Sequence, residues 1–222
     1  PEKGEEVKAF SGSDKVHMIQ LDLTDLNSVD LLVDQIKERF GKLDIVVCNA
    51  AVVAKKARKT KQGLEEMFQV NYLANYYLLR KLWDNEMINF HDSTPRIVIV
   101  NSESHRDAKK FDWDHFGEFR PHSIGKTVEL YGYYKLLLVT FARELSRRMN
   151  IDQKVSVFTL CPGPVNSNIA REAPKAFMPL LKLVFGIFFS SPEKAREPVV
   201  FLSTSTDVEE KAFDYLFLME RK

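Results

Sequence analysis

The sequence predicts an α/β protein: a doubly wound parallel sheet between two layers of helices. Short, nearly all-apolar runs alternate with segments in which apolar residues recur at helical spacing. Alternation at this spacing is typical of βαβ units, which build parallel sheets with helices on both faces. No internal repeat or Pro/Gly-rich linker divides the 222 residues. We therefore expect one domain over residues 1–222.

Five apolar runs predict the strands. The run 43–50 ("LDIVVCNA") is nearly all apolar, as is typical of a strand covered on both faces. The predicted strands are 16–23, 43–50, 96–102, 155–163 and 213–219.

Helical periodicity and end signals predict the helices between these strands. Thr24 and Asp25 are cap candidates for the first helix, and Gly41 is its stop signal. Pro192 begins the last helix. The predicted helices follow Asp25 up to Gly41 and then span 63–87, 126–150 and 192–205.

Composition excludes several classes of function. The formal net charge of +1 gives no reason to expect a nucleic-acid partner. Cys48 and Cys161 each lie in an apolar run, which favours buried free thiols in a reduced, cytoplasmic compartment, and no Cys/His cluster has metal-ligand spacing. The N-terminus lacks the apolar segment of a signal peptide. The apolar stretch 176–189 is too short to span a bilayer; it is expected to be core or a lid, with peripheral membrane contact as the lesser alternative.

In open α/β sheets, ligands bind beyond the carboxyl ends of the strands. Polar or small residues follow the predicted strands at these ends. They are Asp22 and Leu23, Asn49 and Ala50, Ser102, and Pro162 with Gly163.

Tyr131 and Lys135 lie four residues apart in "ELYGYYKLLL", on one face of a predicted helix. Taken alone, this pattern fits an aromatic helix face packed on the sheet as well as it fits catalysis. A hydride transfer to a carbonyl needs a proton donor, and tyrosine has an ordinary pKa of about 10. A nearby ammonium is expected to lower that pKa.

The ordered motifs resemble those of the short-chain dehydrogenase/reductase family over essentially the whole chain. "DLTD" resembles its adenine-contacting segment, "CNAA" (48–51) its Asn-Asn-Ala-Gly turn, and "CPGPVNS" its Pro-Gly-x-Val-x-Thr element, with Ser167 for Thr. Asn71, Ser102 and the Tyr131-x-x-x-Lys135 pair match its catalytic residues. The segment "NSESHR" is similar in sequence to the retinol dehydrogenase and WW-domain oxidoreductase branch.

The resemblance implies a Rossmann-like fold, NAD or NADP as cofactor with NADP slightly favoured, and a role for each matched residue. Tyr131 would move the proton, Lys135 would support it and bind the nicotinamide ribose, and Ser102 would hold the substrate oxygen. Asn71 would fix a water that relays protons to Lys135. The implied cofactor-binding residues are Asp22, Leu23, Asn49, Ala50, Tyr131, Lys135, Pro162, Gly163, Val165 and Ser167.

Structural interpretations remain for most of these positions. Asp22 can be a turn former, Asn71 can satisfy local backbone, Ser102 can merely end its strand and Pro162-Gly163 can be a plain turn. Ser104 and His105 are alternatives to Ser102, ranked below it. Tyr133 and Tyr134 are expected to be structural.

The family's opening strand and Gly-rich turn, Thr-Gly-x-x-x-Gly-x-Gly, have no counterpart in the sequence. That turn receives the pyrophosphate. By the resemblance, the first βαβ portion is missing, so the run 16–23 must pair with 43–50, remain unpaired or await a missing segment. A bare edge on 43–50 would invite aggregation.

Two hypotheses follow. The first is an NAD(P)-dependent oxidoreductase that interconverts an alcohol and a carbonyl, with a lipophilic substrate such as a retinoid or steroid. The second is a truncated, non-catalytic module that acts by binding or dimerisation. In either case the resemblance implies a homodimer through the helices 63–87 and 126–150.

Overall fold

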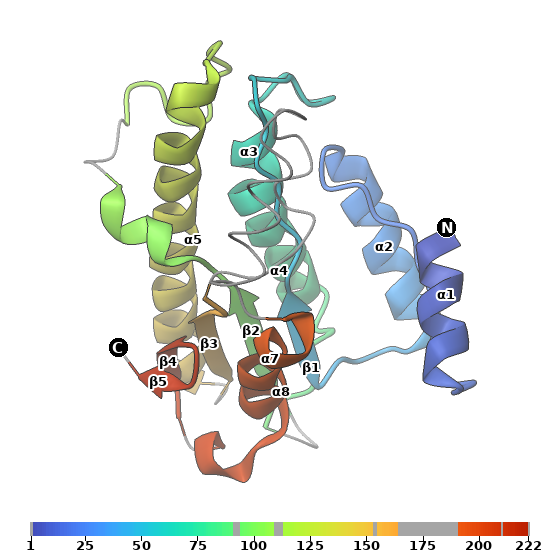
Figure 1. Ribbon diagram of the computed structural model, residues 1–222. Coiled ribbons are helices and arrows are strands. Elements are labelled where there is room, and N and C mark those ends of the chain that lie inside the picture. Colours follow the sequence, from blue (N-terminus) through green and yellow to red (C-terminus); the bar gives the residue numbers. More distant parts are fainter. Residues whose placement is uncertain are drawn as a thin grey trace.

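The computed structural model describes residues 2–90, 94–108, 113–152, 155–163, 191–209 and 211–221 (Figure 1). The helices are α1 (Glu2–Ser11), α2 (Leu26–Arg39), α3 (Glu66–Phe68), α4 (Ala74–Asp84), α5 (Ile124–Asp152), α7 (Pro192–Ala195) and α8 (Glu197–Thr204). The strands are β1 (Ile45–Cys48), β2 (Arg96–Val100), β3 (Ser156–Cys161), β4 (Phe213–Phe217) and β5 (Glu220–Arg221). Short turns are the π-helical η1 (Gln69–Leu73) and the 3-10 turns η2 (Glu103–Asp107) and η5 (Thr206–Val208).

The sheet has the order β1-β2-β3-β4-β5. Strands β1 to β4 are parallel, and β5 turns back antiparallel to β4. Consecutive parallel strands need crossover connections, which here contain the predicted helices. The predicted strands 43–50, 96–102, 155–163 and 213–219 are confirmed, and the α/β class with them.

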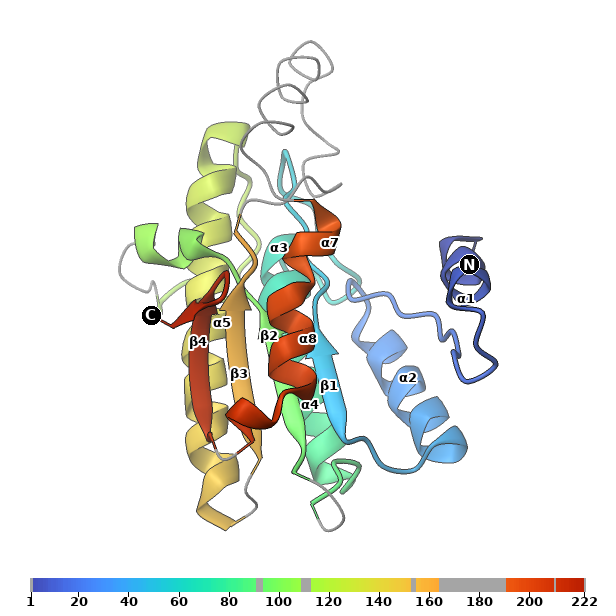
Figure 2. The ribbon, with the colours of Figure 1, turned by 60° about the horizontal axis from the view of Figure 1, so that its bottom comes forward.

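Helices cover both faces of the sheet, which makes three layers. On one face, Leu79 and Leu82 of α4 and Leu138 of α5 pack with Ile97 and Ile99 of β2. On the other face, α8 packs on β2 and β3 through a second buried cluster. Figure 2 shows α8 in front of the sheet, with α4 and α5 behind it.

The ends of α2 follow the sequence signals. Asp25 is the N-cap, and its side chain accepts a hydrogen bond from the backbone N–H of Asn27 at 3.1 Å. Gly41 adopts φ +76°, and its N–H donates to the Ile36 carbonyl at 3.2 Å. Both signals are therefore confirmed.

The predicted helix 63–87 is interrupted near its start. Residues Gln69–Leu73 form a π-helical turn, in which the Ala74 N–H bonds to the Gln69 carbonyl. Such turns occur often at functional sites. Asn71, a candidate catalytic residue, lies in the middle of this turn.

The predicted strand 16–23 is wrong. In the structure this segment has no regular secondary structure and no strand partner, and Met18 is 47% exposed. A strand is stabilised by its ladder of hydrogen bonds, so an apolar run without a neighbour does not form one. The segment instead joins α1 to α2, which packs on α4. Helix α1 was not predicted; it lies beyond α2, away from the sheet (Figure 1).

The expectation that β1 is covered on both faces is also wrong. Val46 and Cys48 face the buried cluster, but Ile45 and Val47 are each 43% exposed. Helix α8 packs on β2 and β3. Strand β1 is also the end strand of the sheet, so its outer edge has no partner among the described strands.

Two smaller expectations can be compared with the structure, and a third falls outside it. Cys48 and Cys161 are buried and free, as predicted. Across the described ranges, no helix has the length and apolarity needed to cross a membrane. Residues 164–190, which include Val165, Ser167 and the expected lid 176–189, lie outside the described residues.

Candidate active site

The structure brings Ser102 and Tyr131 together at the carboxyl end of the sheet. Ser102 lies two residues after β2 and is the N-cap of η2. Tyr131 is half-buried on α5, and its side chain interacts with the Ser102 side chain by hydrogen bonding. Helix α5 lies close along η2, which explains how residues 29 positions apart meet.

Burial dominates the ionisation of Tyr131. It raises the pKa of the phenol to about 12, and the hydrogen-bonding interaction with Ser102 offsets only part of this effect. The expectation that Lys135 lowers this pKa toward neutrality is wrong for the chain without cofactor. At neutral pH Tyr131 is a neutral phenol, which can donate a proton.

Lys135 is buried, with 2% of its surface exposed. Its ammonium Nζ donates to the Val100 carbonyl at 3.0 Å and lies 5.7 Å from the centre of the Tyr131 ring. Burial lowers the pKa of Lys135 to about 8, and the nearby Cys161 raises it slightly. The Lys135 ammonium therefore donates its described hydrogen bond to a backbone carbonyl of β2 and not to the phenolic oxygen of Tyr131.

Asn71 is fully buried and holds the loop after β1. Its Nδ2 donates to the Val52 carbonyl at 2.9 Å, and its Oδ1 accepts from the Val52 N–H at 2.8 Å. This paired bond fixes the chain that follows Asn49 and Ala50. The structure thus gives Asn71 a backbone-holding role, and the water relay to Lys135 stays a prediction.

Ser104 and His105, ranked below Ser102, surround it. The Ser102 hydroxyl donates to Ser104 Oγ at 3.1 Å and accepts from the Ser104 N–H at 3.3 Å. His105 Nδ1 lies 2.7 Å from the Ser102 carbonyl oxygen, and its ring packs on Tyr215. The two residues orient Ser102, while only Ser102 has a described interaction with Tyr131.

The expected cofactor-binding residues divide into two groups. Asn49 and Ala50 are exposed after β1, and Pro162 and Gly163 are half-buried after β3. These four lie at the same sheet edge as Tyr131.

Asp22 and Leu23 are used locally. The Asp22 carboxylate accepts from the Thr24 N–H and hydroxyl at 2.9 and 2.7 Å, so it forms a turn. The Leu23 carbonyl accepts from Gln69 at 3.1 Å. Neither observation requires a ligand.

Known proteins resemble this chain in sequence and in fold. The family model for short chain dehydrogenases matches residues 1–111, which is half of the 222-residue chain. The chain belongs to the short-chain dehydrogenase family. Human retinol dehydrogenase 14 is 30% identical over 90% of the chain and 57% of its own length. The Drosophila melanogaster WW domain-containing oxidoreductase is 32% identical over 85% of the chain and 45% of its own length. The chain thus spans about half the length of these relatives.

Solved short-chain dehydrogenase structures share the fold. A mutant short-chain dehydrogenase/reductase from Serratia marcescens superimposes with a TM-score of 0.69 at 21% identity, covering 99% of this chain and 84% of that one. A Burkholderia cenocepacia short chain dehydrogenase in complex with NADP gives 0.64 at 19% identity, covering 90% and 73%.

The described residues fit the reacting end of the NAD(P) cofactor that this family implies, but not its phosphate end. One edge of the sheet carries the carboxyl ends of β1 and β3 together with Tyr131 and the buried Lys135. The sequence contains no Gly-rich turn of the family's spacing, and the outer side of β1 is exposed. Backbone N–H groups in such a turn normally receive the pyrophosphate. The sheet edge is thus suited to hold the nicotinamide ribose, whereas the described part of the chain offers no cradle for the phosphates.

Sequence reasoning missed two residues of this short-chain dehydrogenase site. Cys161 Sγ accepts from the Glu103 N–H at 3.3 Å and lies beside Tyr131 and Lys135. Asn101 connects the end of β2 to α5. Asn101 precedes the candidate Ser102, and Cys161 precedes the candidate Pro162. Their position at a strand end was the feature of the sequence that could have indicated them.

Proposed function

We propose that this short-chain dehydrogenase is an NAD(P)-dependent oxidoreductase that interconverts an alcohol and a carbonyl. This proposal rests on the observation that Ser102, Tyr131 and Lys135 lie close together at the carboxyl edge of the sheet. When bound, the nicotinamide supplies or accepts the hydride. The chain's own residues supply the proton and the position.

Each side chain has a defined task in carbonyl reduction. Ser102 holds the carbonyl oxygen, and Tyr131 Oη gives its proton to that oxygen as negative charge develops there. A phenol with a pKa of about 12 is still a stronger acid than the alcohol that forms. Lys135, whose ammonium is held on the Val100 carbonyl beside the Tyr131 ring, would bind the nicotinamide ribose.

The names of the relatives support a lipophilic substrate. Human polyprenol dehydrogenase is 26% identical over 95% of the chain. Together with retinol dehydrogenase 14, it favours a long-chain isoprenoid alcohol over a sugar. The Burkholderia cenocepacia complex with NADP shares the fold, and the preference for NADP over NAD rests on the branch resemblance alone.

Replacing Tyr131 by Phe tests this proposal. We expect Tyr131→Phe to lower turnover of retinoid or polyprenol alcohols at least 100-fold, because the proton-transferring oxygen is removed. Tyr133→Phe, which removes a hydroxyl two residues away on α5, is the matched control and keeps activity. Equal turnover by the two variants would remove Tyr131 from the mechanism.

A non-catalytic binding module is the second candidate, which the oxidoreductase names of the relatives do not favour. Thermal unfolding with increasing NADPH or NADH separates the two. Protection at micromolar cofactor supports the enzyme, and no protection at millimolar cofactor supports the module.

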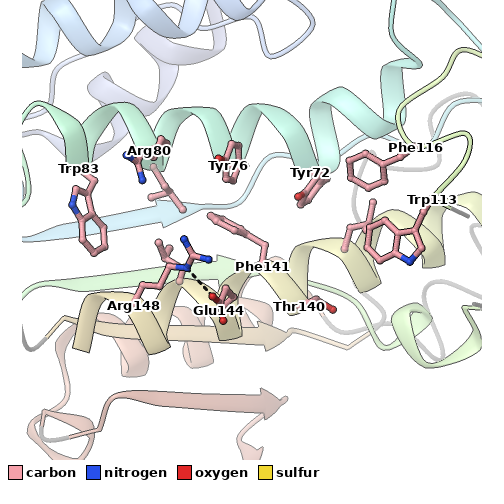
Figure 3. A pocket seen from close by; sticks show the side chains of 13 residues that line it. Tyr72, Tyr76, Arg80, Trp83, Trp113, Phe116, Thr140, Phe141, Glu144 and Arg148 are labelled. Carbon is pink, nitrogen blue, oxygen red and sulfur yellow. Dashed lines mark hydrogen bonds and ion pairs between the residues drawn. The ribbon is translucent and has the colours of Figure 1, made fainter. Parts of the chain in front are cut away.

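We further propose a homodimer through α4 and α5. Figure 3 shows a groove of about 400 Å³ between these helices, lined by aromatic side chains. Tyr76 is 41% exposed and Trp113 is 66% exposed. None of Ser102, Tyr131 and Lys135 lines this groove, so it is separate from the site. Light scattering of Tyr76→Lys, expected to be monomeric, tests the dimer.

A further inference from the structure

Three consecutive residues at the end of β2 contact the Tyr131–Lys135 turn of α5. The Val100 carbonyl accepts from Lys135 Nζ at 3.0 Å, and the Ser102 side chain interacts with Tyr131. Between them, Asn101 Nδ2 donates to the backbone carbonyl of Lys135 at 3.2 Å. Lys135 is therefore held at both its ammonium and its backbone.

Asn101 also fixes the backbone of Ser102. Its Oδ1 accepts from the Ser102 N–H at 2.9 Å, and its own N–H donates to the Leu160 carbonyl of β3 at 2.6 Å. The carboxamide is buried, with 4% of the residue exposed. One side chain thus joins the backbone of Ser102 to the backbone of Lys135.

We propose that Asn101 is a positioning residue that holds Ser102 and Lys135 in register for the reaction, an inference that rests on the oxidoreductase function proposed above. Asparagine suits this place because a neutral amide donates and accepts at once. Aspartate would keep the acceptor for Ser102 but could not donate to the Lys135 carbonyl. A hydrophobic residue would leave both buried backbone groups without this partner.

Loss of the Asn101 hydrogen bonds should lower turnover and not only stability. Catalysis depends on the placement of reacting groups to within about an ångström, so a small shift of Ser102 lowers turnover strongly. Both polar atoms of the Asn101 amide already have protein partners, so we do not expect it to bind an alcohol substrate. We therefore expect an effect on kcat with little effect on KM.

The test compares Asn101→Ala and Asn101→Asp with Ser146→Ala. Ser146 is a matched control, because it is buried on α5 and donates to the Ala212 carbonyl at 2.9 Å, remote in sequence from Tyr131 and Lys135. Two readouts are used: kcat and KM for a retinoid or polyprenol alcohol with NADP, and hydrogen exchange of the Ser102 amide relative to the Phe158 amide of β3.

For Asn101→Ala we expect at least a tenfold loss of kcat with KM within twofold, and at least tenfold faster relative exchange at Ser102. Asn101→Asp, which serves if the alanine variant does not fold, should keep the Ser102 protection and still lose kcat. Ser146→Ala should change neither readout.

Two results would overturn the inference: Asn101 variants with the kcat of Ser146→Ala, or Ser102 exchange unchanged in Asn101→Ala. Failure of the proposed function looks different, because the unaltered chain would then show no turnover at all. In that case Asn101 has no reaction to position, and the inference is overturned with the function.

Discussion

At the scale of single residues, the main feature of the site is a lysine buried at a cost to stability. The pKa of Lys135 is about 8 in the folded chain, against 10.5 for an ordinary lysine, because burial disfavours the charged form. Its hydrogen bond to Val100 offsets this cost only in part. Such a group is retained where its charge has a task, here beside Tyr131.

Replacing Lys135 by Met should stabilise the fold at pH 7. Below pH 8 both the folded and the unfolded chain carry the proton, so the folded state bears the full cost of the buried charge. Between pH 8 and 10.5 the folded state binds fewer protons, so the free energy of unfolding of the unaltered chain rises with pH. We expect Lys135→Met to gain about 1–4 kcal/mol at pH 7. This gain should shrink toward zero by pH 10.5.

Urea unfolding across this pH range measures the gain. The exposed Lys42 provides the control, because Lys42→Met removes a charge that remains in water. A pH-independent difference between Lys135→Met and the unaltered chain would show that Lys135 is not buried as an ammonium.

At the scale of elements, the site depends on the close approach of η2 to α5. A Cβ added at Gly132 would lie 2.5 Å from the Ser104 carbonyl oxygen, which is backbone and cannot turn aside. Gly132 follows Tyr131 in the sequence, and the Ser104 hydroxyl is hydrogen-bonded to the Ser102 hydroxyl. The absence of a side chain at 132 therefore permits the Ser102–Tyr131 contact.

Gly132→Ala should destabilise the chain even though alanine favours helices. Overpacking costs about 1–3 kcal/mol and exceeds the gain of about 1 kcal/mol in helix propensity. Gly125→Ala on the same helix is the control, because its Cβ meets only the Ser123 Oγ at 3.9 Å. Denaturant unfolding should show a loss for Gly132→Ala and none for Gly125→Ala. A stabilised Gly132→Ala would mean that η2 packs elsewhere.

At the scale of the whole molecule, the open edge of β1 is the weak point of this chain. Ile45 and Val47 are half exposed on a strand whose outer edge has no partner among the described strands. Unpaired edges with apolar side chains promote association between sheets.

Val47→Lys should slow aggregation of the 222-residue chain severalfold and change the free energy of unfolding by less than about 0.5 kcal/mol. Turbidity on incubation measures the first effect, and urea unfolding the second. Val46→Lys is the contrast, since Val46 packs against the buried cluster and its replacement should destabilise the fold. Unchanged aggregation of Val47→Lys would exclude β1 as the association edge.

Local patterns predicted much of the fold and the site. Asp25 and Gly41 delimit α2 as expected, because a cap depends mainly on neighbouring residues. Four of the five predicted strands formed, and each of them has a partner in the sheet. The strand 16–23 failed because strand formation needs a partner that periodicity does not report. The position of Asn101, next to the selected Ser102, could not suggest that its amide would reach α5.

The sequence by itself determined the alternation of strands and helices, their order, and the spacing of Ser102, Tyr131 and Lys135, since these follow from short-range propensity and periodicity. Only the tertiary structure decided which groups meet and how they ionise. It buried Lys135 and turned its ammonium to Val100, and it raised the pKa of Tyr131 above its ordinary value. Desolvation and long-range hydrogen bonds depend on what packs around a group, and no local pattern of residues contains that information.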